Sequence, residues 1–231
     1  MWEPQLELAD AGWRVIAPQL RGMDGGAADP PATSIDDFAA DVIDLLDALH
    51  IDDAVIGGLS MGGYVAFALF RHAPRYFRGL VLADTRSQAD TPEGVESRKR
   101  MVALVREKGA AAIAAEMLPK LLSDATRQHQ PDVVERVRAL TLANSAEAIA
   151  GALAALMTRP DSTPLLQTIH CPTLILVGRD DTVTPPALSE ELHRRIAGSE
   201  LAIVENAGHL SSLEQPAVFN EALARFLEHR V

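Results

Sequence analysis

The sequence predicts an α/β protein with a mainly parallel sheet that helices cover on both faces. Short, continuous apolar runs of the strand type alternate along the chain with segments in which apolar residues recur at helical spacing. This alternation is interrupted once, over residues 86–168, where the apolar patterns are helical. At 231 residues and 48% hydrophobic, the chain is most simply one domain, 1–231, with a helical insertion.

The first elements are predicted as a short helix over 3–11, a strand over 13–20 and a loop over 21–31 that is rich in Gly, Asp and Pro. Ser34 is a typical N-cap for the next helix, since apolar residues recur at helical spacing behind it. These residues are Ile35, Phe38, Val42, Leu45 and Leu49.

The remaining strands and helices alternate in the same way. An apolar strand leads into Ser60, and a helix follows it to about His72. Further buried strands are predicted over 79–83, 173–178 and 201–204. The last two helices begin near Pro185 and Pro216, in agreement with the preference for proline in the first helical turn.

The insertion over 86–168 is predicted to be a helical lid above the carboxyl ends of the strands. The alternative is that its helices are ordinary covering helices, because both arrangements produce the same sequence pattern. A lid would enclose a mostly apolar pocket of the kind that binds small ligands. The candidate lining residues are Met117, Leu121, Leu153 and Met157.

The segment Gly58-Leu59-Ser60-Met61-Gly62 has the G-x-S-x-G pattern of a nucleophile elbow. A serine on a sharp strand-to-helix turn has a crowded backbone, so the residues two positions away on each side must lack bulk. Such a turn exposes the hydroxyl and places the Met61 amide at a helix N-terminus, where it favours an oxyanion. The alternative is a glycine-rich junction whose serine only caps the helix.

Three predicted strand ends carry groups suited to nucleophilic catalysis, and in parallel sheets these ends meet at one edge. Ser60 follows one strand, Asp180 and Asp181 follow another, and His209 follows the last. Singly, such an aspartate or histidine is usually a turn or surface residue. Together they stand in the order Ser, Asp, His, which is one of the known orders of serine-hydrolase triads.

In this order, and in motifs from its first helix to its last, the chain resembles the α/β-hydrolase fold enzymes. The motifs are Arg21-Gly22, Gly58-Leu59-Ser60-Met61-Gly62-Gly63, Gly178-Arg179-Asp180-Asp181-Thr182-Val183-Thr184-Pro185, Asn206-Ala207-Gly208-His209 and Glu214-Gln215-Pro216. The chain is most similar to small lidded serine esterases and lactonases, such as 3-oxoadipate enol-lactonases and cofactor-free haloperoxidase-like esterases. The match makes Asp181, not Asp180, the triad acid. Asp84 is an alternative, because some members take the acid from that earlier strand end.

The resemblance implies cleavage of a small, largely apolar carboxylic ester or lactone through an acyl-enzyme. Ser60 is then the nucleophile, His209 the general base and Asp181 the group that orients the imidazole. The Met61 amide donates a hydrogen bond to the oxyanion. The resemblance implies no metal and no organic cofactor, and the expected partner is the small-molecule substrate.

Family members begin with about three more strands, and a His-Gly loop behind the third supplies a second oxyanion donor. Here no histidine is followed by glycine, and Met1-Trp2 resembles the middle of the helix after that loop. We therefore expect that the N-terminal strands are missing through a start codon assigned too far downstream, and that the 231-residue form is poorly soluble or nearly inactive. Two classes stay open: a serine hydrolase, and a non-catalytic or impaired hydrolase-fold protein that binds a ligand or partner.

The composition excludes several other classes of protein. The net charge of -11 argues against a nucleic-acid or anionic-membrane surface. Cys171 is the only cysteine, so an intrachain disulfide is impossible, and no Cys/His cluster has metal-ligand spacing. The first residues lack an apolar signal core, and no run reaches the roughly 18 apolar residues that span a bilayer. We expect a soluble protein of a reducing compartment, the cytoplasm.

Overall fold

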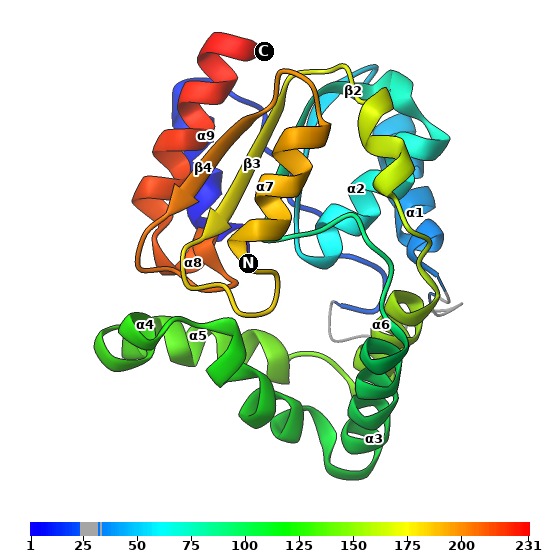
Figure 1. The fold of residues 1–231 in the computed structure, drawn as a ribbon, viewed down its shortest axis with the longest axis vertical. Coiled ribbons are helices and arrows are strands. Elements are labelled where there is room, and N and C mark those ends of the chain that lie inside the picture. Colours follow the sequence, from blue (N-terminus) through cyan, green and yellow to red (C-terminus); the bar gives the residue numbers. More distant parts are fainter. Residues whose placement is uncertain (24–31, 33) are drawn as a thin grey trace.

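The computed structural model describes residues 1–23, 32 and 34–231. These described residues form a four-stranded sheet in the order β1-β2-β3-β4, and each neighbouring pair of strands is parallel. The strands are β1 (Ala54–Leu59), β2 (Phe77–Ala83), β3 (Thr173–Gly178) and β4 (Glu200–Val204). Because all strands are parallel, their carboxyl ends lie at one edge of the sheet, and the predicted α/β class with a parallel sheet is confirmed (Figure 1).

Helices cover both faces of this sheet (Figure 1). The first face carries α1 (Ile35–Ala48), α2 (Met61–His72) and α7 (Pro186–Arg195). The second face carries the 3-10 helix η1 (Glu3–Ala11), α8 (Ser211–Glu214) and α9 (Pro216–Arg230). Two short 3-10 helices, η2 (Pro74–Tyr76) and η3 (Thr163–Thr168), lie in the connections.

Strand β2 shows how the two hydrophobic clusters arise on the two faces. Its side chains alternate, so Leu80 and Leu82 belong to the cluster under α1, α2 and α7, whereas Val81 and Ala83 belong to the cluster under α9. A strand that is buried on both faces must be apolar at every position. This is why the strands appear in the sequence as continuous apolar runs.

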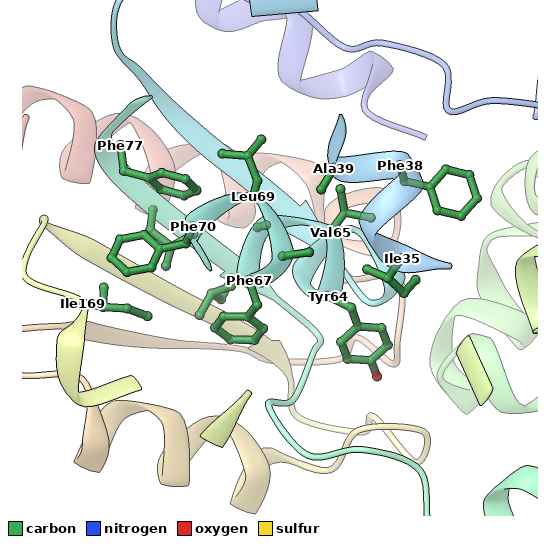
Figure 2. Close-up of a cluster of buried hydrophobic side chains, with 14 of the residues drawn as sticks. Ile35, Phe38, Ala39, Tyr64, Val65, Phe67, Leu69, Phe70, Phe77 and Ile169 are labelled. Carbon is green, nitrogen blue, oxygen red and sulfur yellow. The ribbon is translucent and has the colours of Figure 1, made fainter. Parts of the chain in front are cut away.

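Helix α2 is the centre of the first cluster, where its buried side chains lie beside those of α1 (Figure 2). Phe67 and Leu69 are fully buried. The rings of Phe70 and Phe77 meet edge-on, with their centroids 5.0 Å apart. Since α2 begins directly behind Ser60, this packing fixes the helix that follows the predicted nucleophile.

The predicted strand over 13–20 is wrong. These residues form neither helix nor strand, and Ile16 is 40% exposed. A strand exists only when a neighbour completes its hydrogen-bond ladder, and the sheet of the described residues ends at β1 and β4. The predicted loop over 21–31 falls mostly on 24–31, outside the described residues. By contrast, Ser34 caps α1 as predicted, since its hydroxyl accepts the Asp37 N–H at 3.2 Å.

Four helices of the segment over 86–168 lie beyond the carboxyl ends of the strands (Figure 1). They are α3 (Pro92–Leu121), α4 (Asp124–His129), α5 (Pro131–Leu142) and α6 (Ala146–Thr158), together called the cap below. Gly109, with a φ of 75°, bends α3, and Val105, Ile113 and Ala150 form a small core between α3 and α6. Within the described ranges no single helix is long and apolar enough to cross a membrane. Only α5 and α6 together, bent by 92°, meet that test.

One buried aspartate joins the two ends of the cap. The Asp90 side chain, 1% exposed, precedes α3 and forms ion pairs with Arg86, Arg98 and Arg159. Arg159 follows α6, so its 2.8 Å pair with Asp90 closes the insertion at its base. Although burial opposes ionisation, hydrogen bonds from Arg159 and Arg98 hold the pKa of Asp90 well below its usual range.

The first prediction concerns this closure. Asp90→Ala removes the carboxylate and leaves the buried Arg159 guanidinium without its ion pair, so the free energy of unfolding should fall by about 3–5 kcal/mol. Urea unfolding followed by circular dichroism measures it. Glu96→Ala is the control, because Glu96 pairs with Lys99 on the exposed surface and should change stability little. Equal losses in both variants would contradict a closing role for Asp90.

Candidate active site

Ser60 lies on a strained turn between β1 and α2. Its φ of 52° and ψ of -112° form a backbone conformation that residues other than glycine rarely adopt. The turn brings Gly58 and Gly62 so close that a Cβ on Gly58 would lie 2.1 Å from the Gly62 carbonyl oxygen. The predicted crowding is therefore present at Gly58, where it excludes any side chain, but it is absent at Gly62, where a Cβ would have nothing within 4 Å.

Two hydrogen bonds from the end of β2 hold this turn. The Ser60 N–H donates to the Ala83 carbonyl at 2.9 Å, and the Thr85 hydroxyl donates to the Ser60 carbonyl at 2.8 Å. Gly63 leaves room for Thr85, since a Cβ on Gly63 would lie 2.4 Å from the threonine Oγ1. Sequence reasoning misses Thr85, and the one signal that could have found it is the additional glycine at position 63.

Ser60, His209 and Asp181 form one chain of hydrogen bonds. His209 Nε2 lies 2.8 Å from Ser60 Oγ, and His209 Nδ1 lies 2.8 Å from Asp181 Oδ2. Asp181 comes from the loop behind β3 and His209 from the loop behind β4. The His209 side chain is 3% exposed and that of Asp181 is fully buried. The carboxyl edge of the sheet thus brings together the three side chains that the sequence singles out.

Asp181 is held by its own loop as well as by His209. Its Oδ1 accepts the N–H groups of Val183 and Thr184 at 2.8 and 2.9 Å, and its Oδ2 accepts the Thr184 hydroxyl at 2.6 Å. Burial opposes ionisation, but the hydrogen bond to His209 and those from Thr184 hold the pKa of Asp181 below its usual value. An ionised Asp181 favours the proton on His209 Nδ1, which leaves Nε2 free to accept from Ser60. Asp180 is exposed on the same loop.

Met61, the predicted oxyanion donor, is the first residue of α2. Its backbone N–H is therefore one of the amides at the helix start that have no acceptor within the helix. Of the predicted lining residues, Met117 packs against the cap core and Leu121 against the cluster under α9, while Leu153 is buried and Met157 half-buried. Their contact with a substrate stays a prediction. The described residues hold no group of three or more His, Cys, Asp or Glu side chains placed to bind a metal.

Asp84, the alternative acid, is fully buried beneath the same loops. Its Oδ1 accepts the Gly178 N–H at 2.8 Å, and its Oδ2 accepts the Ser211 hydroxyl at 2.5 Å. These bonds join the end of β3 to the start of α8, whereas His209 Nδ1 bonds to Asp181. Burial raises the pKa of Asp84 to about 7, although the charge of His209 and the bond from Ser211 partly offset this effect.

The chain is similar to known hydrolases over almost its whole length. The model of the alpha/beta hydrolase family matches residues 1–222. The 3-oxoadipate enol-lactonase 2 of Acinetobacter baylyi is 32% identical over 223 residues, which are 96% of this chain and 82% of that protein. The pimeloyl-[acyl-carrier protein] methyl ester esterase of Neisseria meningitidis serogroup B is 32% identical over an alignment of 239 positions, which covers 99% of this chain and 88% of that protein. A solved thermophilic esterase from Thermogutta terrifontis has a TM-score of 0.94 at 39% identity, covering 98% of this chain and 84% of that one.

The second prediction concerns the titration of Asp84. Its pKa is about 7 in the folded protein against 3.8 for a free side chain, so the folded state binds the extra proton between these values. The contribution of Asp84 to stability is therefore complete below about pH 4 and falls as the pH rises through 7. Asp181 has a lowered pKa and therefore the opposite pH dependence. Its contribution to stability is already complete at any pH above the pKa that it has in the unfolded chain.

Urea unfolding at pH 5 and pH 8 measures this contribution. The wild type should lose more unfolding free energy between the two pH values than Asp84→Asn does, because the amide does not titrate. Asp52→Asn, at an exposed position, is the control and should follow the wild type. The same pH dependence in all three proteins would show that Asp84 does not titrate in this range.

Proposed function

Because the chain belongs to the alpha/beta hydrolase family, we propose that it cleaves a small, largely apolar carboxylic ester or lactone with Ser60 as nucleophile, His209 as general base and Asp181 as the acid of the triad. The chain is an ester-cleaving hydrolase of this family, similar to a lactonase and to esterases. The observation that carries the finer proposal is the pair of 2.8 Å hydrogen bonds that join His209 to Ser60 and to Asp181.

In the first half of the reaction, Ser60 Oγ attacks the substrate carbonyl carbon while His209 Nε2 takes the hydroxyl proton. The Asp181 carboxylate accepts the hydrogen bond of Nδ1–H and stabilises the imidazolium that forms. The carbonyl oxygen becomes an oxyanion that accepts the Met61 N–H at the start of α2, where the helix dipole also favours negative charge. The C–O bond to the alcohol then breaks, and His209 returns the proton to the leaving oxygen.

In the second half, water replaces the alcohol. His209 Nε2 takes a proton from the water as it attacks the acyl carbon, and the same Met61 N–H receives the second oxyanion. Collapse of this intermediate breaks the bond to Ser60 Oγ, which recovers its proton from His209. For a lactone the leaving oxygen stays attached to the acyl group, so the product is a single hydroxy acid or its tautomer.

We propose that the cap is a lid over Ser60. The end of α3 bonds to the loops that carry Asp181 and His209, which supports this assignment. The Leu121 carbonyl accepts the His209 N–H at 2.9 Å, and the Lys120 carbonyl accepts the Thr182 hydroxyl at 3.3 Å. A cover this close to the base limits the size of the acyl and alcohol parts that reach Ser60.

The third prediction tests the nucleophile. Ser60→Ala removes the attacking oxygen, so kcat on a chromogenic ester should fall by at least about 10⁴-fold and labelling by a fluorophosphonate probe should disappear. Ser97→Ala, in an exposed position on α3, should label and react like the wild type. Labelling that persists in Ser60→Ala would mean another nucleophile. A folded wild type that neither labels nor turns over esters would favour the alternative of a non-catalytic or impaired hydrolase-fold protein.

The fourth prediction tests the substrate class. A series of p-nitrophenyl esters with acyl chains from two to sixteen carbons, measured together with small lactones, compares acyl size directly. If the cap is a lid, kcat/KM should be highest for short acyl chains and should fall by at least about tenfold for the longest. A preference for the longest chains would contradict a closed, small site.

A further inference from the structure

Glu214, the last residue of α8, is a buried carboxylate whose two oxygens reach different parts of the molecule. Its Oε1 accepts the N–H groups of Gly208 and Leu210 at 2.9 and 3.2 Å. These two residues flank His209 in the sequence. Its Oε2 accepts the Ser123 N–H of the cap at 2.8 Å. One side chain therefore joins the loop of the proposed base to the cap.

The cap reaches the same loop through residues 120–123, which we call the cap corner. The Leu121 carbonyl accepts the N–H of His209 itself, and the Ser123 hydroxyl donates to the Asn206 carbonyl at 3.2 Å. The two backbones touch, since a Cβ on Gly208 would lie 2.7 Å from the Ser123 nitrogen. Only glycine at position 208 allows this approach.

The backbone N–H groups at and beside His209 thus donate to acceptors that lie outside the loop between β4 and α8. The three consecutive N–H groups of Gly208, His209 and Leu210 donate to Glu214 or to the cap corner. Buried amides must find acceptors, and bonds to a carboxylate in a dry environment are the stronger kind. A shift of the cap corner or of Glu214 would move the backbone from which the His209 imidazole reaches Ser60.

We propose that Glu214 is a positioning residue which, with the cap corner, makes the orientation of His209 depend on the seating of the cap. This inference rests on the proposed function, in which His209 is the general base. The three hydrogen bonds given for Glu214 all go to backbone N–H groups, so in this role it acts through the loop backbone. The alternative is that Glu214 only stabilises the fold, and the two interpretations differ in what a folded variant does.

The fifth prediction tests the link that Glu214 forms between the His209 loop and the cap corner. Hydrogen exchange measures this link without an activity assay. In Glu214→Ala, backbone exchange should rise together in the peptides that cover 206–211 and 119–124, because both lose the same acceptor. Peptides from α7, on the other face of the sheet, are the internal reference. Glu221→Gln, at an exposed position on α9, is the matched control and should exchange like the wild type.

Two further variants separate the contacts that join the His209 loop to the cap corner, and they can be used if Glu214→Ala does not fold. Glu214→Gln keeps one acceptor oxygen for Gly208 and Leu210 but turns an NH₂ group toward the Ser123 N–H, so the cap peptide should exchange faster than the His209 peptide. Ser123→Ala keeps that N–H and removes the bond to the Asn206 carbonyl, so exchange over 206–211 should rise while Glu214 keeps its acceptor oxygens. The variant also removes the hydroxyl that accepts the Thr126 N–H at the start of α4, so exchange over 124–129 should rise too.

Kinetics then tests positioning against a purely structural role. Since a misplacement of about 1 Å can cost about 100-fold, Glu214→Ala should lower kcat by about 10- to 100-fold with KM within about twofold, and Glu214→Gln should lie between it and the wild type. Rates are compared at equal folded concentration, so a loss of stability alone leaves kcat unchanged.

The possible results decide the two proposals separately. Exchange that rises in only one of the two peptides in Glu214→Ala, or a folded Glu214→Ala with wild-type kcat, overturns the positioning proposal. A wild type that does not label at Ser60 overturns the proposed function, and the exchange data still decide whether Glu214 joins the cap to the loop.

Discussion

Three carboxylates, Asp84, Asp181 and Glu214, are buried together where the strands end, and this constraint organises the carboxyl edge of the sheet. Burying a carboxylate costs free energy unless its oxygens accept hydrogen bonds. The surrounding loops must therefore turn backbone amides and hydroxyls inward. They do so with strained backbone where necessary, at a φ of 44° for Asp84 and 57° for Asn206. The loops behind β2, β3 and β4 are therefore shaped by the acids that they enclose.

The sequence was sufficient for elements whose burial follows a recognisable pattern, either continuous along a strand or at helical spacing. The predicted strand over 173–178 has the bounds of β3, and the helical spacing behind Ser34 marks α1, because each pattern follows directly from which side chains are buried. The strand over 13–20 failed for a physical reason. Its residues have a strand-like composition, but a strand is a relation between two segments, and composition does not reveal whether the second segment is present.

The candidate site likewise has a part that could be predicted from the sequence and a part that could not. The proximity of Ser60, Asp181 and His209 could be predicted because each follows an apolar strand and parallel strands bring their ends together. The supporting bonds could not. Glu214 binds an amide 91 positions away, and Asp84 binds amides 94 and 127 positions away. Every residue except proline has a backbone N–H, so such a partner leaves no trace in the sequence.

The distances along the chain have a consequence for synthesis on the ribosome. Ser60 and His209 are separated by 149 positions, and the Gln5 side chain of η1 bonds to Asn220 of α9, 215 positions away. A growing chain therefore displays the serine, its glycines and the whole cap long before the histidine is made. Contacts of such large sequence separation form slowly even in a finished chain. Ser60 consequently spends most of translation without His209, its hydrogen-bond partner in the finished fold, and a nascent chain that stops short of the last strand holds the serine without that partner.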